Sequence, residues 1–151
     1  MVGRKYIFGT DKGFTLIEIL VVISIISLLT ALILIPLTET RIKAKDGRIV
    51  LSMAQIRPVA ALYFSDHNNT YAGLESNPNI TILLNDVGAN GGEKPSDGSV
   101  GADIFIDGVE NNKYCIEVKM NNATFWCVDY TGVSKKYNED PGCGAAYFSC
   151  D

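Results

Sequence analysis

The sequence predicts an α+β fold in which a long N-terminal helix packs on a small antiparallel β-sheet. Three observations lead to this prediction. An uncharged apolar run fills residues 19–35, a helical stripe of apolar residues follows it, and strand-like alternation occupies residues 113–137. Of the 151 residues, 47% are apolar and 20% are charged, which excludes a disordered tail and fits one domain with a short appendage.

The apolar run is long enough to cross a bilayer. Counted from Phe14, it covers about 22 residues, or roughly 33 Å as a helix. It is apolar on all sides, so no single face of a small domain would bury it. Arg4, Lys5 and Lys12 precede it, and positive charge at this place favours a cytoplasmic N-terminus. We therefore expect the chain after Pro36 to lie on the outer side of the membrane.

Two simpler interpretations of the run fit less well. A secretory signal peptide has a shorter apolar stretch and a small-residue cleavage site, which Leu34–Thr38 does not supply. An ordinary single-span anchor fits the length but leaves Glu18 unexplained, since a carboxylate at membrane depth costs a few kcal/mol. A glutamate that extends to the membrane interface is the plain alternative for this residue.

A third interpretation accounts for Glu18 and for the residues before it. The segment Lys-Gly-Phe-Thr-Leu-Ile-Glu at residues 12–18 resembles the processing signature of type IV pilins and type II secretion pseudopilins. The resemblance implies that a prepilin peptidase cuts after Gly13 and methylates the new amino group of Phe14. Glu18 then matches the glutamate at the fifth mature position of this family. The resemblance is tight over residues 12–35 and says little about the last ninety residues.

The resemblance also implies a division of the chain. It gives a leader at 1–13, a transmembrane and filament-core helix at 14–36, an amphipathic continuation at 37–68 and a globular region at 69–151. Loss of the leader removes three basic residues and one acidic residue, which changes the net charge from −4 to −6. With no local basic patch to offset this charge, we expect no sequence-specific nucleic-acid partner.

Cleavage has a physical consequence for assembly. The freed amino group of Phe14 has an ordinary pKa of about 7.7–8. A buried amine and a buried carboxylate are each costly alone but tolerable as a pair. We hypothesise that Glu18 of one subunit meets Phe14 of its neighbour and so sets the axial register. Pro36 is the twenty-third mature residue, one later than the proline of many pilins, and it predicts a helix kink.

The helix is expected to continue to about residue 66 with one apolar face. The stripe residues recur at spacings of 7, 4, 3, 4 and 3, namely Ile42, Ile49, Met53, Ile56, Ala60 and Tyr63. The basic group Arg41–Arg48 lies on other faces and is either simply solvated or in contact with lipid headgroups or acidic neighbours. Turn-forming residues at 66–70 end the helix.

The remaining chain divides into a loop zone and a strand zone. Residues 72–112 are rich in turn formers and correspond to the variable αβ-loop of pilins, with 80–84 as a short helix or strand. Residues 114–119 and 124–130 alternate around 120–123, which predicts a hairpin, and 133–137 adds a third strand.

Four cysteines allow three disulfide pairings. If the hairpin turns near Asn121, Cys115 faces Cys127 and a cross-strand bond is reasonable. A bond from Cys143 to Cys150 would close a loop that resembles the disulfide-bounded C-terminal region of many pilins. A four-cysteine zinc site is the rival, but the spacing lacks the close cysteine pair typical of such sites.

Other ligand or catalytic groups are weakly indicated. Asp97, Asp103 and Asp107 lie in a glycine-rich stretch and are calcium candidates, yet their spacing matches no calcium motif and a solvated acidic loop is favoured. No nucleophile motif accompanies the single histidine, His67, so we expect neither an enzyme nor another cofactor.

Taken with the resemblance, these features predict a structural subunit of a type IV pilus that serves adhesion, surface motility or DNA uptake. Its expected partners are further copies of itself, the prepilin peptidase, the assembly machinery and, before assembly, the inner membrane. The prepilin would sit in the cytoplasmic membrane and the mature subunit in an extracellular filament. A pseudopilin of a type II secretion system is the alternative, and a single-span anchor that displays a binding domain is a further one.

Overall fold

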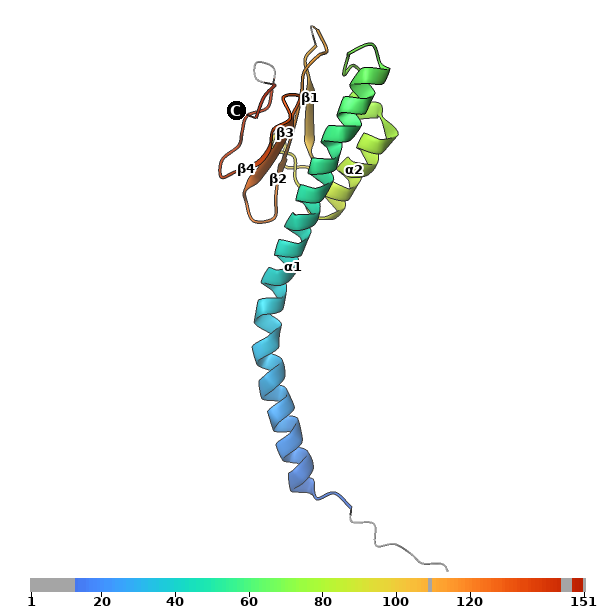
Figure 1. Ribbon diagram of the computed structural model, residues 1–151. Coiled ribbons are helices and arrows are strands. Elements are labelled where there is room, and N and C mark those ends of the chain that lie inside the picture. Colours follow the sequence, from blue (N-terminus) through green and yellow to red (C-terminus); the bar gives the residue numbers. More distant parts are fainter. Residues whose placement is uncertain (1–12, 109, 145–147, 151) are drawn as a thin grey trace, which may run out of the picture. The chain divides into compact units, whose positions relative to one another are not determined.

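The computed structural model describes residues 13–108, 110–144 and 148–150, without the side chains of residues 34–36. Two helices, a short 3₁₀ turn and four strands make up the described chain (Figure 1). Their bounds are α1 Leu16–Asp66, η1 Leu74–Ser76, α2 Pro78–Ala89, β1 Asp103–Ile106, β2 Tyr114–Lys119, β3 Phe125–Asp129 and β4 Ser134–Tyr137. The predicted α+β class is confirmed.

The chain forms two compact units that meet between Thr38 and Glu39, and α1 runs through both. The first unit contains the apolar part of α1, and the second contains the rest of α1 and all other elements. The amphipathic helix and the globular region, predicted as separate stretches, thus form one unit. The backbone of α1 is helical at Pro36, and the kink expected there stays a prediction.

The sheet has the strand order β1-β2-β3-β4, and every neighbouring pair is antiparallel. The predicted hairpin is confirmed as β2 and β3, joined by a turn in which the Met120 N–H donates to the Thr124 carbonyl at 2.7 Å. The third predicted strand is confirmed as β4. Strand β1 pairs with the other side of β2 and was not predicted, because it is only four residues long inside a glycine-rich segment.

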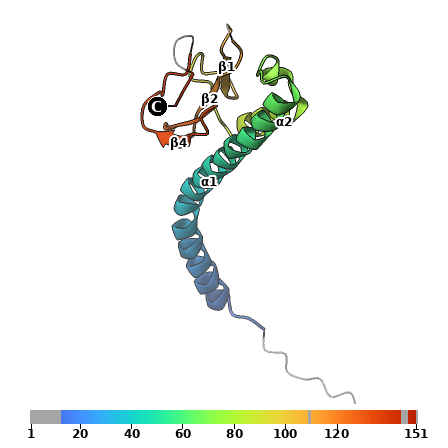
Figure 2. The same cartoon turned by 45° about the horizontal axis from the view of Figure 1, so that its top comes forward.

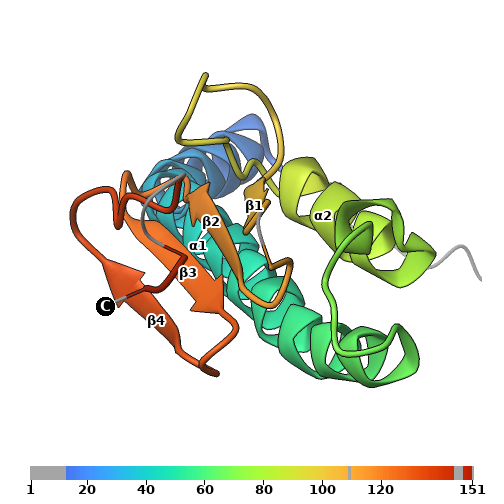
Figure 3. The same ribbon diagram turned by 90° about the horizontal axis from the view of Figure 1, so that it is seen from above.

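The core lies between the C-terminal part of α1 and one face of the sheet (Figure 3). Five of the six stripe residues of α1 are buried there, namely Ile49, Met53, Ile56, Ala60 and Tyr63. They pack with the side chains that β2 and β3 direct to the same side, which are Tyr114, Ile116, Val118 and Val128. Ile42 is 38% exposed, so the buried stripe begins one step later than predicted. Apolar burial of this kind is the main stabilising contribution to folding.

The short helix or strand expected at residues 80–84 of the loop zone is a helix, and α2 extends it to Pro78–Ala89. The Asn77 side chain accepts hydrogen bonds from the backbone N–H groups of Asn79 and Ile80, and Pro78 occupies the first helical position. The helix lies beside the C-terminal part of α1 (Figure 2). Asp86 connects the two helices, since it pairs with Arg48 at 2.9 Å and accepts a hydrogen bond from the Ser52 hydroxyl. At least one member of the basic group Arg41–Arg48 is therefore paired within the chain.

Candidate functional site

The predicted cleavage point lies just before α1. Gly13, Phe14 and Thr15 have no regular secondary structure, and the helix begins at Leu16. Phe14 is 84% exposed, and no atom of the described residues lies within 4 Å of the position that a Cβ on Gly13 would take. The peptide bond between Gly13 and Phe14 is thus open to a peptidase, and the apolar helix lies entirely on its C-terminal side.

Glu18 has hydrogen-bond partners within its own chain. Its carboxylate accepts from the Thr15 backbone N–H at 2.8 Å and from the Thr15 hydroxyl at 2.7 Å, while the Glu18 N–H donates to the Thr15 hydroxyl at 3.3 Å. This reciprocal arrangement is a capping box, which satisfies N–H groups that a helix start leaves without partners. Sequence analysis missed it, although the Thr-x-x-Glu spacing at residues 15–18 is its usual signal. The predicted pairing of Glu18 with the Phe14 amine of a neighbour stays a prediction.

The apolar part of α1 offers an unbroken apolar surface. Its large side chains between Phe14 and Ile33 are 48% to 88% exposed. The hydroxyls of Ser24, Ser27 and Thr30 each donate to the carbonyl four residues earlier at 2.7 Å, so they add no unsatisfied donor. By length and composition, α1 is the one helix of the described chain that can cross a membrane. Apolar area of this size is covered by lipid or by other helices.

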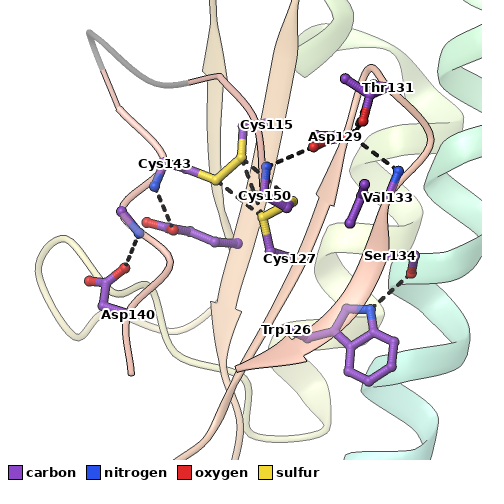
Figure 4. The surroundings of a disulfide bond; sticks show 12 residues. Cys115, Trp126, Cys127, Asp129, Thr131, Val133, Ser134, Asp140, Cys143 and Cys150 are labelled. Carbon is purple, nitrogen blue, oxygen red and sulfur yellow. Dashed lines mark hydrogen bonds between the residues drawn. A yellow bond between two sulfur atoms is a disulfide. The ribbon is translucent and has the colours of Figure 1, made fainter. Parts of the chain in front are cut away.

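The predicted disulfide pairing is wrong. The bonds join Cys115 to Cys143 and Cys127 to Cys150, with 5.8 Å between the Cα atoms of each pair (Figure 4). The hairpin register explains the error, because Cys127 lies opposite Glu117 and not opposite Cys115. Cys115 and Cys127 are therefore diagonal neighbours on one face of the sheet.

The C-terminal segment, which follows β4 and is described at residues 138–144 and 148–150, supplies the partners for both strand cysteines. It crosses the sheet face that α1 does not cover, which we call the outer face, and brings Cys143 and Cys150 onto it (Figure 4). The four sulfur atoms lie within 4.8 Å of one another, and all four residues are buried. Instead of closing a loop on itself, the C-terminal segment is fastened to the two central strands.

Two buried carboxylates reinforce this attachment. The Cys143 N–H donates to Glu117 of β2 at 3.0 Å, and the Cys150 N–H donates to Asp129 of β3 at 2.7 Å. Glu117 is 3% exposed and Asp129 is fully buried. Each strand thus holds one C-terminal cysteine by a disulfide and by a carboxylate two residues further on. Sequence analysis missed this pattern, although Cys-x-Glu and Cys-x-Asp place both side chains on one face of a strand.

The environment of Glu117 makes its carboxyl group sensitive to pH. Burial raises the pKa of Glu117 to about 7, although the hydrogen bond from the Cys143 N–H acts in the opposite direction. The negative charges of Asp140 and Asp103 raise the Glu117 pKa further. The attachment of the C-terminal segment to β2 therefore includes a group that titrates near neutral pH.

The three calcium candidates do not form one site in the described chain. Asp97 accepts a hydrogen bond from the Ser99 N–H at 2.8 Å, and Asp103 accepts from the Ser96 N–H and hydroxyl at 2.8 and 2.9 Å. Both carboxylates thereby hold the loop that precedes β1. Among the described residues, only the four cysteines bring metal-ligating atoms together in a group of three or more. In the structure those cysteines are joined in disulfides.

Comparison with known proteins matches the N-terminal part of the chain. The family described as the prokaryotic N-terminal methylation motif matches residues 10–34. No curated protein and no solved structure matches the chain. The match covers the predicted cleavage point, the capping box and most of the apolar part of α1.

Proposed function

We propose that this chain, which carries the signature of type IV pilins and pseudopilins, is the structural subunit of a type IV pilus. The observation that carries the proposal is the placement of the signature directly before an exposed apolar helix. Such a helix needs lipid before assembly and other helices afterwards. A signature of this kind implies a structural subunit that a prepilin peptidase processes and that assembles into filaments, and it fits a membrane-anchored prepilin.

The position of the cleavage point explains how the same helix can lie in the membrane before assembly and pack against other helices in the filament. Cleavage between Gly13 and Phe14 leaves α1 intact and creates an amino group four residues from Glu18. Glu18 already caps its own helix through Thr15. In the filament its charge would also attract the amine of a neighbouring subunit, since a buried charge is tolerated only with a partner.

The outer face supports a role outside the cytoplasm. Disulfides persist in oxidising compartments, and two of them attach the C-terminal segment to the sheet. The C-terminal segment is held to the sheet at Cys143 and again at Cys150. This double attachment suits a subunit exposed on a surface filament. A pseudopilin of a type II secretion system has the same N-terminal requirements and is the second candidate.

The intact mass of the protein purified from cells tests the proposal. We expect a chain that begins at Phe14, carries one added methyl group and has lost four hydrogens to two disulfides. Material sheared from the cell surface should contain a pilus subunit, whereas a secretion pseudopilin should stay in the cell envelope. A chain that still carries its first thirteen residues, or that never leaves the lipid phase, would contradict the proposal.

Two substitutions separate the capping role of Glu18 from its charge. Glu18→Gln keeps an oxygen for the capping box but removes the charge, whereas Glu18→Ala removes both. We expect both variants to be cleaved normally and both to give fewer filaments, measured as sheared protein per cell. Glu39→Gln, on an exposed part of α1, is the matched control. A normal filament yield from Glu18→Gln would show that the charge does not set the register.

A further inference from the structure

A pocket of about 330 Å³ opens in the second unit, between α1 and the turn after β3. Its wall includes Arg57 of α1, Tyr71, Tyr114 at the start of β2, and Tyr130. The volume is at the lower end of the range for small-molecule sites. A ligand built on one ring would fill it.

Two tyrosine hydroxyls at this pocket have no hydrogen-bond partner among the described residues. Tyr71 and Tyr114 are 7% and 2% exposed, and their rings meet edge to face at 4.7 Å. Neither hydroxyl forms a hydrogen bond with any described residue, neither oxygen is among the fully buried unpaired atoms, and both residues line the pocket. Tyr63 behaves differently, because its hydroxyl donates to the Ala72 carbonyl at 2.6 Å. Since the hydroxyl of a buried tyrosine is normally paired, these two are available to a ligand.

Arg57 adds a positive charge at the edge of the same pocket. Its guanidinium lies against Gly132, where a Cβ would come 3.0 Å from Nη2. Gly132 has a φ of +91°, so a larger residue there would be strained as well as crowded. Within the described chain Arg57 has no carboxylate partner, in contrast to Arg48, which is paired with Asp86.

The charge around the pocket limits the kind of ligand. Burial raises the pKa of both Tyr71 and Tyr114, so their hydroxyls stay protonated and can donate. The nearest acidic group, Asp129, is fully buried and accepts hydrogen bonds from Thr131, Val133 and Cys150. The Arg57 guanidinium and the two tyrosine hydroxyls are hydrogen-bond donors, and Arg57 is positively charged, so the pocket suits an anionic ligand. The negative charge of Asp129 disfavours a doubly charged anion.

We propose that this pocket binds a monocarboxylate carried on a single six-membered ring. Arg57 would hold the carboxylate, because guanidinium and carboxylate match in a two-pronged geometry. The Tyr71 and Tyr114 hydroxyls would donate to its oxygens. The apolar wall formed by Ala54, Pro58 and Ala61 would pack against the ring. The proposal does not rest on the assignment of the chain as a pilus subunit.

Calorimetric titration of the full chain in detergent micelles tests the site. Two probe pairs differ mainly in the carboxylate: glucuronate with glucose, and benzoate with benzamide. We expect the acid to bind at least about tenfold more tightly than the neutral compound in at least one pair. Arg57→Gln should weaken binding of that acid by about tenfold or more, and Tyr114→Phe or Tyr71→Phe by several-fold.

The control variant is Arg41→Gln, which removes the same charge from an exposed position elsewhere on α1. It should bind the acid as the unaltered chain does. Thermal unfolding of each variant shows whether the fold is kept, and Tyr114→Phe tests the pocket without changing any charge. The proposal is overturned if neither acid binds better than its neutral partner, or if Arg41→Gln weakens binding as much as Arg57→Gln.

Discussion

The two faces of the central hairpin are covered in different ways. The inner face meets the apolar stripe of α1, and side chains such as Met53 and Ile116 pack there with no exposed area. The outer face meets the C-terminal segment, which is held by disulfides and by the carboxylates of Glu117 and Asp129. Strand β2 is thus buried by apolar packing on its inner side. On its outer side it is buried by disulfides and carboxylate hydrogen bonds, beside a smaller apolar group of Phe105, Val133 and Tyr137.

Because the two faces are covered differently, they should respond differently to redox state and pH. Apolar packing is insensitive to redox state and pH in the ordinary range, because it depends on area removed from water. Disulfides depend on the redox potential of the surroundings, and a buried carboxyl group depends on pH. We therefore expect chemical conditions to loosen the outer face and to leave the inner face in place.

Reduction of the disulfides should have the largest effect. We expect a loss of roughly 2–5 kcal/mol in the free energy of unfolding for each bond, because the unfolded chain gains freedom. Urea unfolding with and without dithiothreitol measures it. Peptide mapping of the oxidised chain should recover Cys115 linked to Cys143 and Cys127 linked to Cys150. Recovery of a peptide that links Cys115 to Cys127 would contradict the register described here.

A cavity in the inner face should cost a similar amount but should not respond to reductant. We expect Met53→Ala to lower the free energy of unfolding by roughly 2–5 kcal/mol, since Met53 is fully buried. The cost should be the same with and without dithiothreitol. Leu51→Ala, at a position that is 58% exposed on the same helix, should change stability by less than about 0.5 kcal/mol. Strong dependence of the Met53→Ala cost on redox state would show that the two faces are coupled.

Glu117→Gln should remove a pH dependence of the free energy of unfolding that belongs to the outer face. The folded pKa of Glu117 is raised to about 7 from the ordinary value of 4.5, so its stabilising contribution is complete below pH 4.5. That contribution is lost as pH rises through 7, because the folded chain binds the proton more tightly than the unfolded one. Glutamine keeps an oxygen for the Cys143 N–H and stays neutral at every pH.

The variant should therefore match the unaltered chain near pH 4 and exceed its free energy of unfolding at pH 8 by up to about 3 kcal/mol. Urea unfolding across this pH range measures the difference. Glu139→Gln, at an exposed carboxyl group of the C-terminal segment, is the control and should show no such trend. A difference between Glu117→Gln and the unaltered chain that does not change with pH would contradict the role of burial.

Some of these elements were predictable because their signals are local. The long helix, the hairpin and the third strand follow from apolar spacing over short stretches, and the structure confirms them. Helix α2 was expected only as a short helix or strand at residues 80–84, although Asn77 and Pro78 mark a helix start that a turn-rich composition obscured. The capping pair of Thr15 and Glu18 was missed, although its Thr-x-x-Glu spacing is a local signal.

The processing signature, the apolar helix after it and the class of the fold could be predicted from the sequence alone. Each depends on residues that lie close together in the chain. Only the tertiary structure decided which cysteines pair and what Glu117 and Asp129 do. These pairings follow from the hairpin register, which places Glu117 opposite Cys127. They also follow from the path of the C-terminal segment across the outer face. A two-residue difference in register changes which side chains meet, and register is set by packing across the whole unit.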